Sequence, residues 1–250
     1  MVAALADAGY VMIAFDASYR GEPRWTKDPA QRVRDFSFVV DHLVTLPFVD
    51  ADHIGVLGVC GGGGYSISAS LTGRRIKAVA SITGVNFGHL LHEAFSAYDP
   101  ITTLELIAAQ RTAEARGAVA NVENLLPPTV DDAQGLDIDV AEATEYYKTD
   151  RGQAPNGCTQ SLVSRRAGGF GWDAFTHAEV LQTQPLLMVI GDKPGAFGAY
   201  RDGMEIYRRS PSTNKQLVVA EGYSHYDLYD LPAATTIALD AAIPFFNEHL

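Results

Sequence analysis

A cysteine and a histidine are the two side chains of this sequence best suited to nucleophilic chemistry. Cys60 stands in the run Gly58-Val59-Cys60-Gly61-Gly62, between an apolar stretch and a segment of small residues. His225 stands in a short loop that follows another apolar stretch. An imidazole that removes the proton of a thiol creates a thiolate, which attacks carbonyl carbon atoms. The pair therefore predicts covalent acyl chemistry.

The glycines after Cys60 favour the same interpretation. Four glycines, Gly61 to Gly64, open the predicted helix, although each costs roughly 0.5 to 1 kcal/mol relative to alanine. A nucleophile elbow requires them, because neighbouring side chains would collide with the adjoining strand and the substrate. The start of a helix also lowers a thiol pKa, and the Gly61 N–H is the expected oxyanion donor. The alternative is that Cys60 is an ordinary buried apolar residue.

A third side chain should orient His225, and Asp192 is the first candidate. Cys60, Asp192 and His225 each follow a predicted strand, in the chain order nucleophile, acid, base that α/β hydrolases use. In this interpretation the acid fixes the histidine tautomer and stabilises the imidazolium. Asp192 could instead only cap the next helix, and Asp202 and Asp227 are alternative acids.

Alternating apolar runs and helical segments predict the elements that position these groups. The expected strands are residues 10–15, 54–58, 77–83, 185–191 and 216–220, with helices between most of them. This order predicts an α/β-hydrolase-type parallel sheet with helices on both faces and ligand groups at the carboxyl ends of its strands. Residues 1–83 and 181–250 form the expected core, and residues 84–180 an inserted, mainly helical cap.

Aromatic and histidine side chains in and near the cap suggest further roles. Tyr65, Trp172 and Phe175 are the expected walls of an acyl pocket, although packing inside the cap is an alternative for the cap aromatics. His89 and His92 could share one helix face, but no further ligand cluster accompanies them. We therefore predict no metal site and no cofactor.

Composition excludes several classes of partner. The net charge of -11 and the pI of about 5.0 argue against binding to nucleic acid or to anionic membranes. Two cysteines cannot build a disulfide framework, and the N-terminus has no basic segment typical of a signal peptide. The sequence predicts a cytoplasmic enzyme with a small-molecule acyl substrate, and a homodimer is compatible with it.

The chain resembles a known family at Gly58-Val59-Cys60-Gly61-Gly62-Gly63-Gly64-Tyr65 and at His225-Tyr226-Asp227-Leu228-Tyr229-Asp230. It is similar to α/β hydrolases related to dienelactone hydrolases, a group that includes fungal polyketide acyl-transferring hydrolases. The likeness extends over most of the chain, including the segment from Phe15 to Glu22. It implies hydrolysis of an ester, lactone or thioester through Cys60 and His225, or acyl transfer at the same site.

The chain departs from this group in two places. Many relatives carry the acid a few residues beyond the glycine that ends its strand, where this chain has Gly195. Relatives also begin with further strands and an oxyanion loop, so we expect an N-terminally shortened form whose first strands are missing.

Two other classes of function remain as alternatives. Gly58, Gly62 and Gly64 match the glycine spacing of a nucleotide-dependent reductase, but the chain has no Tyr-xxx-Lys pair and no acid for a ribose after the next strand. A non-catalytic or redox-sensing relative would oxidise Cys60 instead of acylating it.

Overall fold

A computed structural model describes residues 1–15, 28–154 and 159–250 of the chain. The motif from Asp16 to Glu22 and the second cysteine, Cys158, lie outside these residues. Among the helices in the described ranges, none has both the length and the apolar character needed to cross a membrane.

The core is a parallel sheet of four strands in the order β1-β2-β5-β6. Its strands are β1 (Ile54–Val59), β2 (Ile76–Ile82), β5 (Leu186–Gly191) and β6 (Lys215–Ala220). At the carboxyl end, Val59 pairs with Ile82, and Gly191 pairs with Ala220. These strands confirm four of the predicted apolar runs. The residues that follow them meet at one edge of the sheet.

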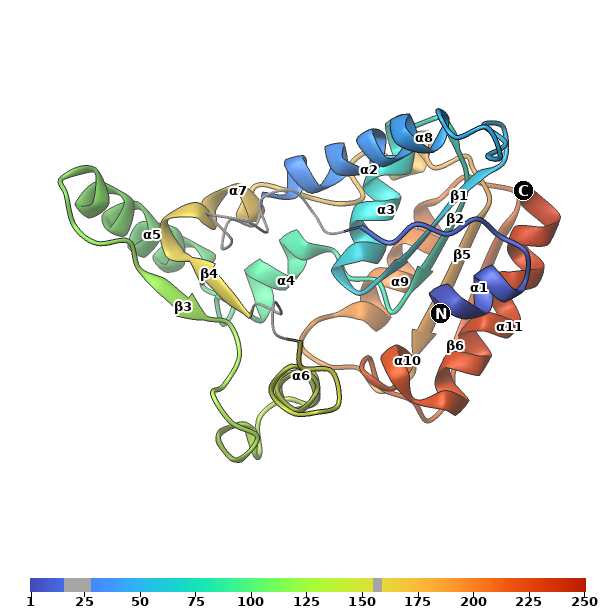
Figure 1. Cartoon of the computed structure of the whole chain (residues 1–250). Coiled ribbons are helices and arrows are strands. Elements are labelled where there is room, and N and C mark those ends of the chain that lie inside the picture. The colour runs from blue at the N-terminus through green and yellow to red at the C-terminus, as the bar shows by residue number, and fades with distance from the viewer. Residues whose placement is uncertain (16–27, 155–158) are drawn as a thin grey trace.

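Helices cover both faces of the sheet, as predicted (Figure 1). On one face lie α1 (Val2–Asp7) and α11 (Pro232–His249); on the other lie α2 (Pro29–Leu43), α3 (Gly61–Thr72), α8 (Ala178–Leu181) and α9 (Ala199–Arg209). Successive strand residues alternate between these layers: Leu187 and Val189 pack toward α11, whereas Leu186 and Met188 pack toward α3 and α9. Burial on both faces explains the continuous apolar runs.

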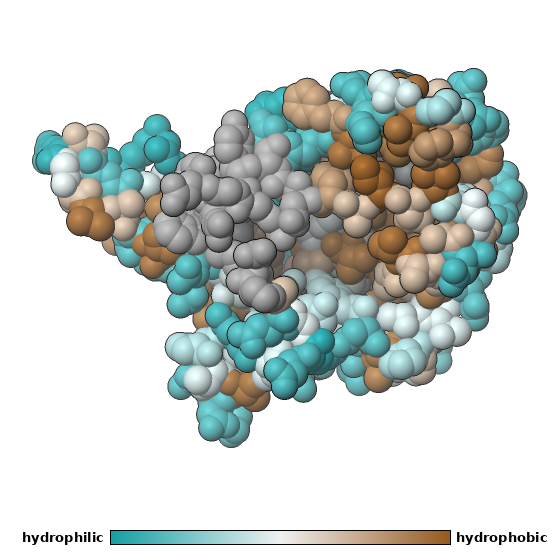
Figure 2. Space-filling view, in the orientation of Figure 1, coloured by the Kyte–Doolittle hydropathy of each residue, from teal (hydrophilic) through white to brown (hydrophobic). Residues whose placement is uncertain are grey.

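The strand predicted at residues 10–15 does not form, so this prediction was wrong. The segment has no regular secondary structure. Tyr10 and Met12 pack against the α11 side, but Val11, Ile13 and Phe15 are 53%, 40% and 38% exposed. Among the described residues no strand pairs with the outer side of β1, so the segment lacks the ladder that would make it a strand. Apolar surface gathers on this side of the molecule (Figure 2).

The segment between β2 and β5 is mainly helical. It contains α4 (Phe87–Glu93), α5 (Pro100–Ala115), α6 (Ile138–Lys148), α7 (Ala167–Phe170), α8, short 3-10 helices at Asp131–Ala133 and Val163–Arg165, and an antiparallel ribbon of β3 (Val122–Asn124) and β4 (Gln160–Leu162). Its middle part extends away from the sheet (Figure 1). Its last part returns to the core, because Ala174, Phe175 and Ala178 are buried with α3 and α9.

Candidate active site

Cys60 lies on a strained turn between β1 and α3. Its φ of 54° and ψ of -128° are unusual for a residue with a side chain. Three backbone hydrogen bonds hold the turn: the Cys60 N–H donates to Ile82, and the Cys60 carbonyl accepts from Gly63 at 2.9 Å and Val85 at 3.0 Å. The thiol is partly exposed. The backbone thus forms the predicted strand-turn-helix unit with Cys60 at its apex.

Glycines allow α3 to pack this closely. A Cβ atom at Gly58 would lie 2.3 Å from the Gly62 carbonyl oxygen, and one at Gly64 would lie 2.2 Å from the Val85 carbonyl oxygen. Any larger residue would push the helix away from the strands. Gly61 differs, because the nearest atom to a Cβ there would be a Tyr65 ring carbon at 3.7 Å. Space therefore remains beside the predicted oxyanion donor.

His225 lies in the loop between β6 and α10 (Asp227–Asp230) and is 3% exposed. Its Nδ1 atom is 2.9 Å from the Thr83 hydroxyl, and its Nε2 atom is 3.2 Å from the Tyr229 hydroxyl. Burial lowers the pKa of His225 to about 3. The imidazole is therefore neutral at physiological pH.

Tyr229 connects the histidine to the cysteine. Its hydroxyl forms hydrogen bonds with both Cys60 and His225. Burial raises the pKa of Tyr229 well above its usual range, and the negative charge of a Cys60 thiolate raises it further. The hydroxyl therefore keeps its proton. The Tyr229 hydroxyl thus lies between Cys60 and His225, which the sequence pattern predicted to be in direct contact.

Sequence analysis missed Thr83 and Tyr229 as neighbours of His225. Tyr229 is four residues after His225, so the spacing of one helical turn could have indicated it. Thr83 carried no such signal. It follows β2, has an unusual φ of 44°, and is fixed by its N–H donating to the Val189 carbonyl at 2.7 Å.

The predicted acid, Asp192, does not reach His225. Its carboxylate is exposed and accepts from the Gly222 N–H at 2.7 Å, because the turn after β5 directs it toward the loop after β6. The alternative acids also bond elsewhere: Asp227 accepts from the Ser224 N–H, and Asp202 binds Asn86, His89 and Arg201. Among the described residues, no hydrogen bond joins any of the three candidate acids to His225, and the assignment of Asp192 stays a prediction.

Comparison with known proteins identifies the family. The sequence model of the family described as BAAT / Acyl-CoA thioester hydrolase C terminal matches residues 33–155. The uncharacterized protein YcjY of Escherichia coli K12 is 34% identical over 254 residues, covering 98% of this chain and 81% of YcjY. The chain belongs to the same family as YcjY.

Solved structures agree with this assignment. Hypothetical protein PA2218 from Pseudomonas aeruginosa has a TM-score of 0.87 at 28% identity, covering 100% of this hydrolase and 78% of that chain. The α/β hydrolase GrgF from Penicillium sp. sh18 shares the fold, with a TM-score of 0.74, 18% identity, and coverage of 92% and 75% of the two chains. The predicted α/β-hydrolase fold is confirmed, and the matching family model supports a hydrolase of ester or thioester bonds.

The three predicted pocket residues have different environments. Tyr65 is buried, and its ring lies 5.1 Å from the Trp172 ring, which is partly buried. The negative charge of a Cys60 thiolate contributes to raising the pKa of Tyr65, although burial is the main cause. Phe175 is only 1% exposed and packs in the core beneath α9. Tyr65 thus lies near the cysteine and Trp172 lies against Tyr65, whereas Phe175 is a core residue; the pocket role of Tyr65 and Trp172 stays a prediction.

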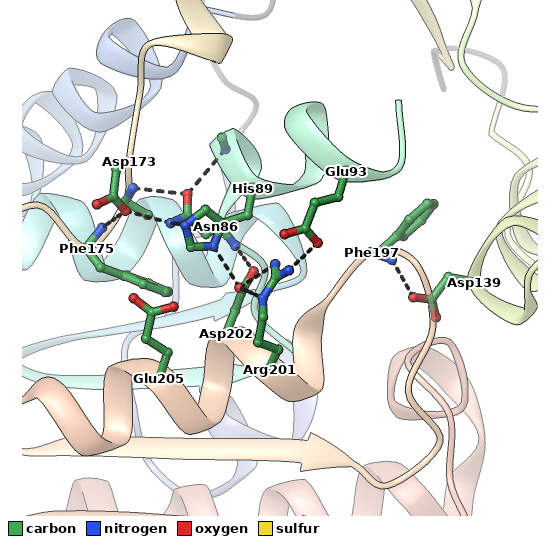
Figure 3. Close-up of polar contacts among 12 residues, drawn as sticks. Asn86, His89, Glu93, Asp139, Asp173, Phe175, Phe197, Arg201, Asp202 and Glu205 are labelled. Carbon is green, nitrogen blue, oxygen red and sulfur yellow. Dashed lines mark hydrogen bonds and ion pairs between the residues drawn. The ribbon is translucent and has the colours of Figure 1, made fainter. Parts of the chain in front are cut away.

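His89 belongs to a polar network that joins α4 to α9 (Figure 3). Asp202 is fully buried and accepts from the Asn86 N–H at 2.7 Å, while its other oxygen bonds His89 at 3.0 Å and Arg201 at 2.8 Å. His89, Asp202 and Glu205 lie close enough to share a cation. The Arg201 guanidinium already neutralises the central carboxylate, so the network is explained as a structural connection. His92 bonds elsewhere, to the Phe170 carbonyl at 2.7 Å.

Proposed function

We propose that this hydrolase cleaves small acyl thioesters, and related esters or lactones, through a covalent intermediate on Cys60. The observation that carries the proposal is the arrangement of Cys60, Tyr229 and His225. The Tyr229 hydroxyl bridges Cys60, at the start of a helix, and His225, whose imidazole is buried and neutral. The thioester hydrolase family that matches residues 33–155 supports thioesters as the first substrates to examine.

The first half of the reaction transfers the acyl group to sulfur. His225 takes the Cys60 thiol proton at Nε2, either through the Tyr229 hydroxyl or directly once that hydroxyl moves. The thiolate attacks the carbonyl carbon, and the Gly61 N–H donates to the oxyanion. This attack forms a tetrahedral intermediate. When the intermediate collapses, the bond to the leaving thiol breaks, and that thiol receives the proton from His225. The products are a Cys60 thioester and a free thiol.

The second half returns the enzyme to its starting state. His225 removes a proton from water, and the hydroxide attacks the Cys60 thioester. Collapse of this second tetrahedral intermediate releases the carboxylic acid, and the proton returns from His225 to the Cys60 sulfur. The sum is one water consumed for each thioester cleaved, with no cofactor required.

The environment of Cys60 favours an apolar acyl group. Aromatic side chains surround the thiol, and Tyr65 and Trp172 are expected to line the acyl pocket. The acidic net charge of -11 makes nucleic acid and anionic membranes poor partners, so we infer a free small-molecule substrate.

The test combines turnover with intact-mass analysis on a panel of acyl-CoA thioesters of increasing chain length. We expect release of free thiol and a mass increase equal to the acyl group, located on Cys60 by peptide mapping. Cys60→Ala should abolish both signals, whereas Cys158→Ala should retain them. Turnover that survives Cys60→Ala would disprove the mechanism. Absence of acylation together with ready capture of an oxidised Cys60 by a sulfenic-acid probe would favour the redox-sensing alternative.

A further inference from the structure

Among the residues that the structure describes, His225 has a hydroxyl, and no carboxylate, at its Nδ1 atom. A threonine hydroxyl can hold the ring in place, but it cannot stabilise the imidazolium that forms during acyl transfer as a carboxylate does. Thr83 is fully buried, so solvent does not supply this stabilisation. The catalytic histidine of the proposed reaction therefore needs an anionic group that neither Asp192, Asp202 nor Asp227 provides.

Asp139 is a buried carboxylate with an unused hydrogen-bonding atom. It is the second residue of α6 and is 1% exposed. Its Oδ2 atom accepts from the Phe197 N–H at 2.8 Å (Figure 3), but within the described part of the chain its Oδ1 atom has no hydrogen-bond partner. Such an atom is rare in folded proteins, because burial without a partner is unfavourable.

Asp139 and His225 face the same small cavity. Its volume is about 10 Å³, and its lining includes Thr83, Asp139, Gly191, Gly195 and His225. A space of this size holds about one water molecule. The ring of Phe197, whose N–H binds Asp139, lies 5.9 Å from the His225 ring. Asp139 and His225 thus line one cavity, and Phe197 contacts both.

Gly195 makes room for this carboxylate. A Cβ atom at position 195 would lie 2.3 Å from the Asp139 Cγ atom and 2.4 Å from its Oδ2 atom. Asp139 therefore fills the space into which a side chain on the loop after β5 would project. The sequence analysis marked position 195 as lacking an expected acid, and in three dimensions an acid from α6 occupies that space.

Further contacts fix α6 against the histidine loop. Arg151, just beyond α6, donates to both carboxylate oxygens of Asp230 at 2.8 and 2.9 Å and to the Tyr226 carbonyl at 3.0 Å. Asp137, just before α6, accepts from the Ala196 N–H at 2.9 Å. Both ends of the helix are therefore anchored, one to the loop after β5 and the other to the loop that carries His225.

We propose that Asp139 is the positioning acid of His225, contributed by the inserted segment in place of an acid on the loop after β5. Its Oδ1 atom acts across the cavity on the Nδ1 side of the imidazole, together with Thr83, and stabilises the imidazolium while Cys60 is acylated. The activity readouts of this inference rest on the proposed function. Its spectroscopic readout does not.

The electrostatics define a pH dependence. Burial raises the pKa of Asp139 to about 7, with a contribution from the negative charges of Asp137 and Glu142 and against the lowering effect of the Phe197 N–H. The other titratable groups at the cavity or near this carboxylate are Lys193, Tyr200, His225 and Tyr226. Asp139 is thus largely protonated below about pH 7, where it cannot stabilise an imidazolium. Activity should rise as the pH passes through about 7.

Three variants test the assignment. Asp139→Asn keeps an oxygen acceptor for the Phe197 N–H but removes the charge. Glu142→Gln is the matched control, because Glu142 lies on the same helix and hydrogen-bonds Ser224 in the histidine loop. Asp139→Ala combined with Gly195→Asp moves the carboxylate onto the loop, where its side chain would occupy the vacated space.

For acyl-thioester turnover, we expect Asp139→Asn to lower kcat by about 10²-fold with little change in KM and to remove the rise near pH 7. Glu142→Gln should keep the kcat of the unmodified enzyme at high pH and retain the rise with pH, moved to a lower pH because one charge that raises the Asp139 pKa is gone. The relocated acid should recover kcat at least about tenfold relative to Asp139→Ala. A kcat and pH profile unchanged by Asp139→Asn would overturn the proposal, as would failure of the relocated acid in a protein that remains folded.

Nitrogen NMR of the His225 ring supplies the readout that does not depend on substrate. In the unmodified protein, the His225 signals should shift with a transition near pH 7 that reports the ionisation of Asp139. The transition should be absent in Asp139→Asn and present in Glu142→Gln. A hydrolase without thioesterase activity but with this transition would disprove the proposed function and retain the inference. Absence of the transition in the unmodified protein would overturn the inference.

Discussion

At the scale of single residues, the unusual feature of the site is the tyrosine hydroxyl between nucleophile and base. Tyr229 contacts Cys60 and His225, and burial keeps it protonated. A neutral hydroxyl in this position can donate to the Cys60 thiolate or pass a proton from the thiol to the imidazole. Both roles assist acylation without consuming the tyrosine.

Removing this hydroxyl should slow acylation without unfolding the protein. A hydrogen bond to a charged group contributes about 1.5 to 3 kcal/mol, so Tyr229→Phe should lower the acylation rate by roughly 10- to 100-fold. Single-turnover kinetics with intact-mass detection measures this rate. Tyr223→Phe, in the same loop, is the control and should behave like the unmodified enzyme. An acylation rate in Tyr229→Phe equal to that of the control would exclude a role for the hydroxyl.

At the scale of elements, the return of the inserted segment to the core separates two aromatic residues that the sequence grouped together. Trp172 lies before this return, against Tyr65, whereas Phe175 lies under α9. Both residues pack against the same core cluster, but Phe175 is fully buried in it whereas Trp172 is only partly buried.

Alanine substitutions should distinguish these environments. Phe175→Ala creates a cavity in the core and should lower the free energy of unfolding by about 3 to 5 kcal/mol. Trp172→Ala should raise the KM for long acyl chains while lowering stability by less. Denaturant unfolding and steady-state kinetics on the same preparations make the comparison. A larger loss of stability in Trp172→Ala than in Phe175→Ala would show that Trp172 is mainly a core residue.

The contact between α4 and α9 should make stability depend on pH. The hydrogen bond to Asp202 raises the pKa of His89. The folded state therefore binds the histidine proton more tightly than the unfolded chain does. The resulting stabilisation is present below the unfolded pKa of about 6.5 and is lost as the pH rises through the raised value.

His89→Gln should accordingly be less stable than the unmodified protein at about pH 5.5, and the difference should shrink toward about pH 8.5. Thermal denaturation across this range measures it. His53→Gln is the control, because His53 forms an exposed pair with Asp50 on the surface. A stability difference that stays constant with pH would show that His89 acts only through packing.

At the scale of the whole molecule, the proposed catalytic groups come from both parts of the chain. The sheet edge carries Cys60, Thr83 and His225, and the inserted α6 brings Asp139. In the proposed arrangement the insertion completes the site as well as covering it. A buried acid beside the histidine loop should have a measurable effect on stability.

Asp139 should destabilise the fold as it ionises. Its pKa is about 7 in the folded protein, against an ordinary value of 3.8 in the unfolded chain, so its favourable contribution is full below pH 3.8 and is lost as the pH rises through about 7. Relative to the unmodified protein, Asp139→Asn should therefore become more stable with rising pH, by up to about 4 kcal/mol. Urea unfolding at several pH values measures this. A relative stability that does not change with pH would mean that the carboxyl group is not buried as described.

The sequence by itself determined the elbow and the sheet that carries it. Strand, glycine, cysteine, glycine and helix are adjacent in the chain, and local sterics restrict what such a run can form. The apolar runs of β1, β2, β5 and β6 likewise reflect burial on both faces of the sheet, a property visible in each strand separately. The positions of Cys60 and His225 after their strands followed from this pattern.

The tertiary structure decided which groups surround His225. Thr83 reaches it through the pairing of β2 with β5, and Asp139 comes to line the same cavity through the packing of α6 against loops distant in sequence. Neither arrangement leaves a periodic signal, because each depends on contacts between residues that are far apart along the chain. For the same reason Asp192 looked suitable from its place after a strand, but the direction of the turn carries it to Gly222 instead. Local sequence fixes which side chains stand at the sheet edge, whereas packing between elements determines which of them meet.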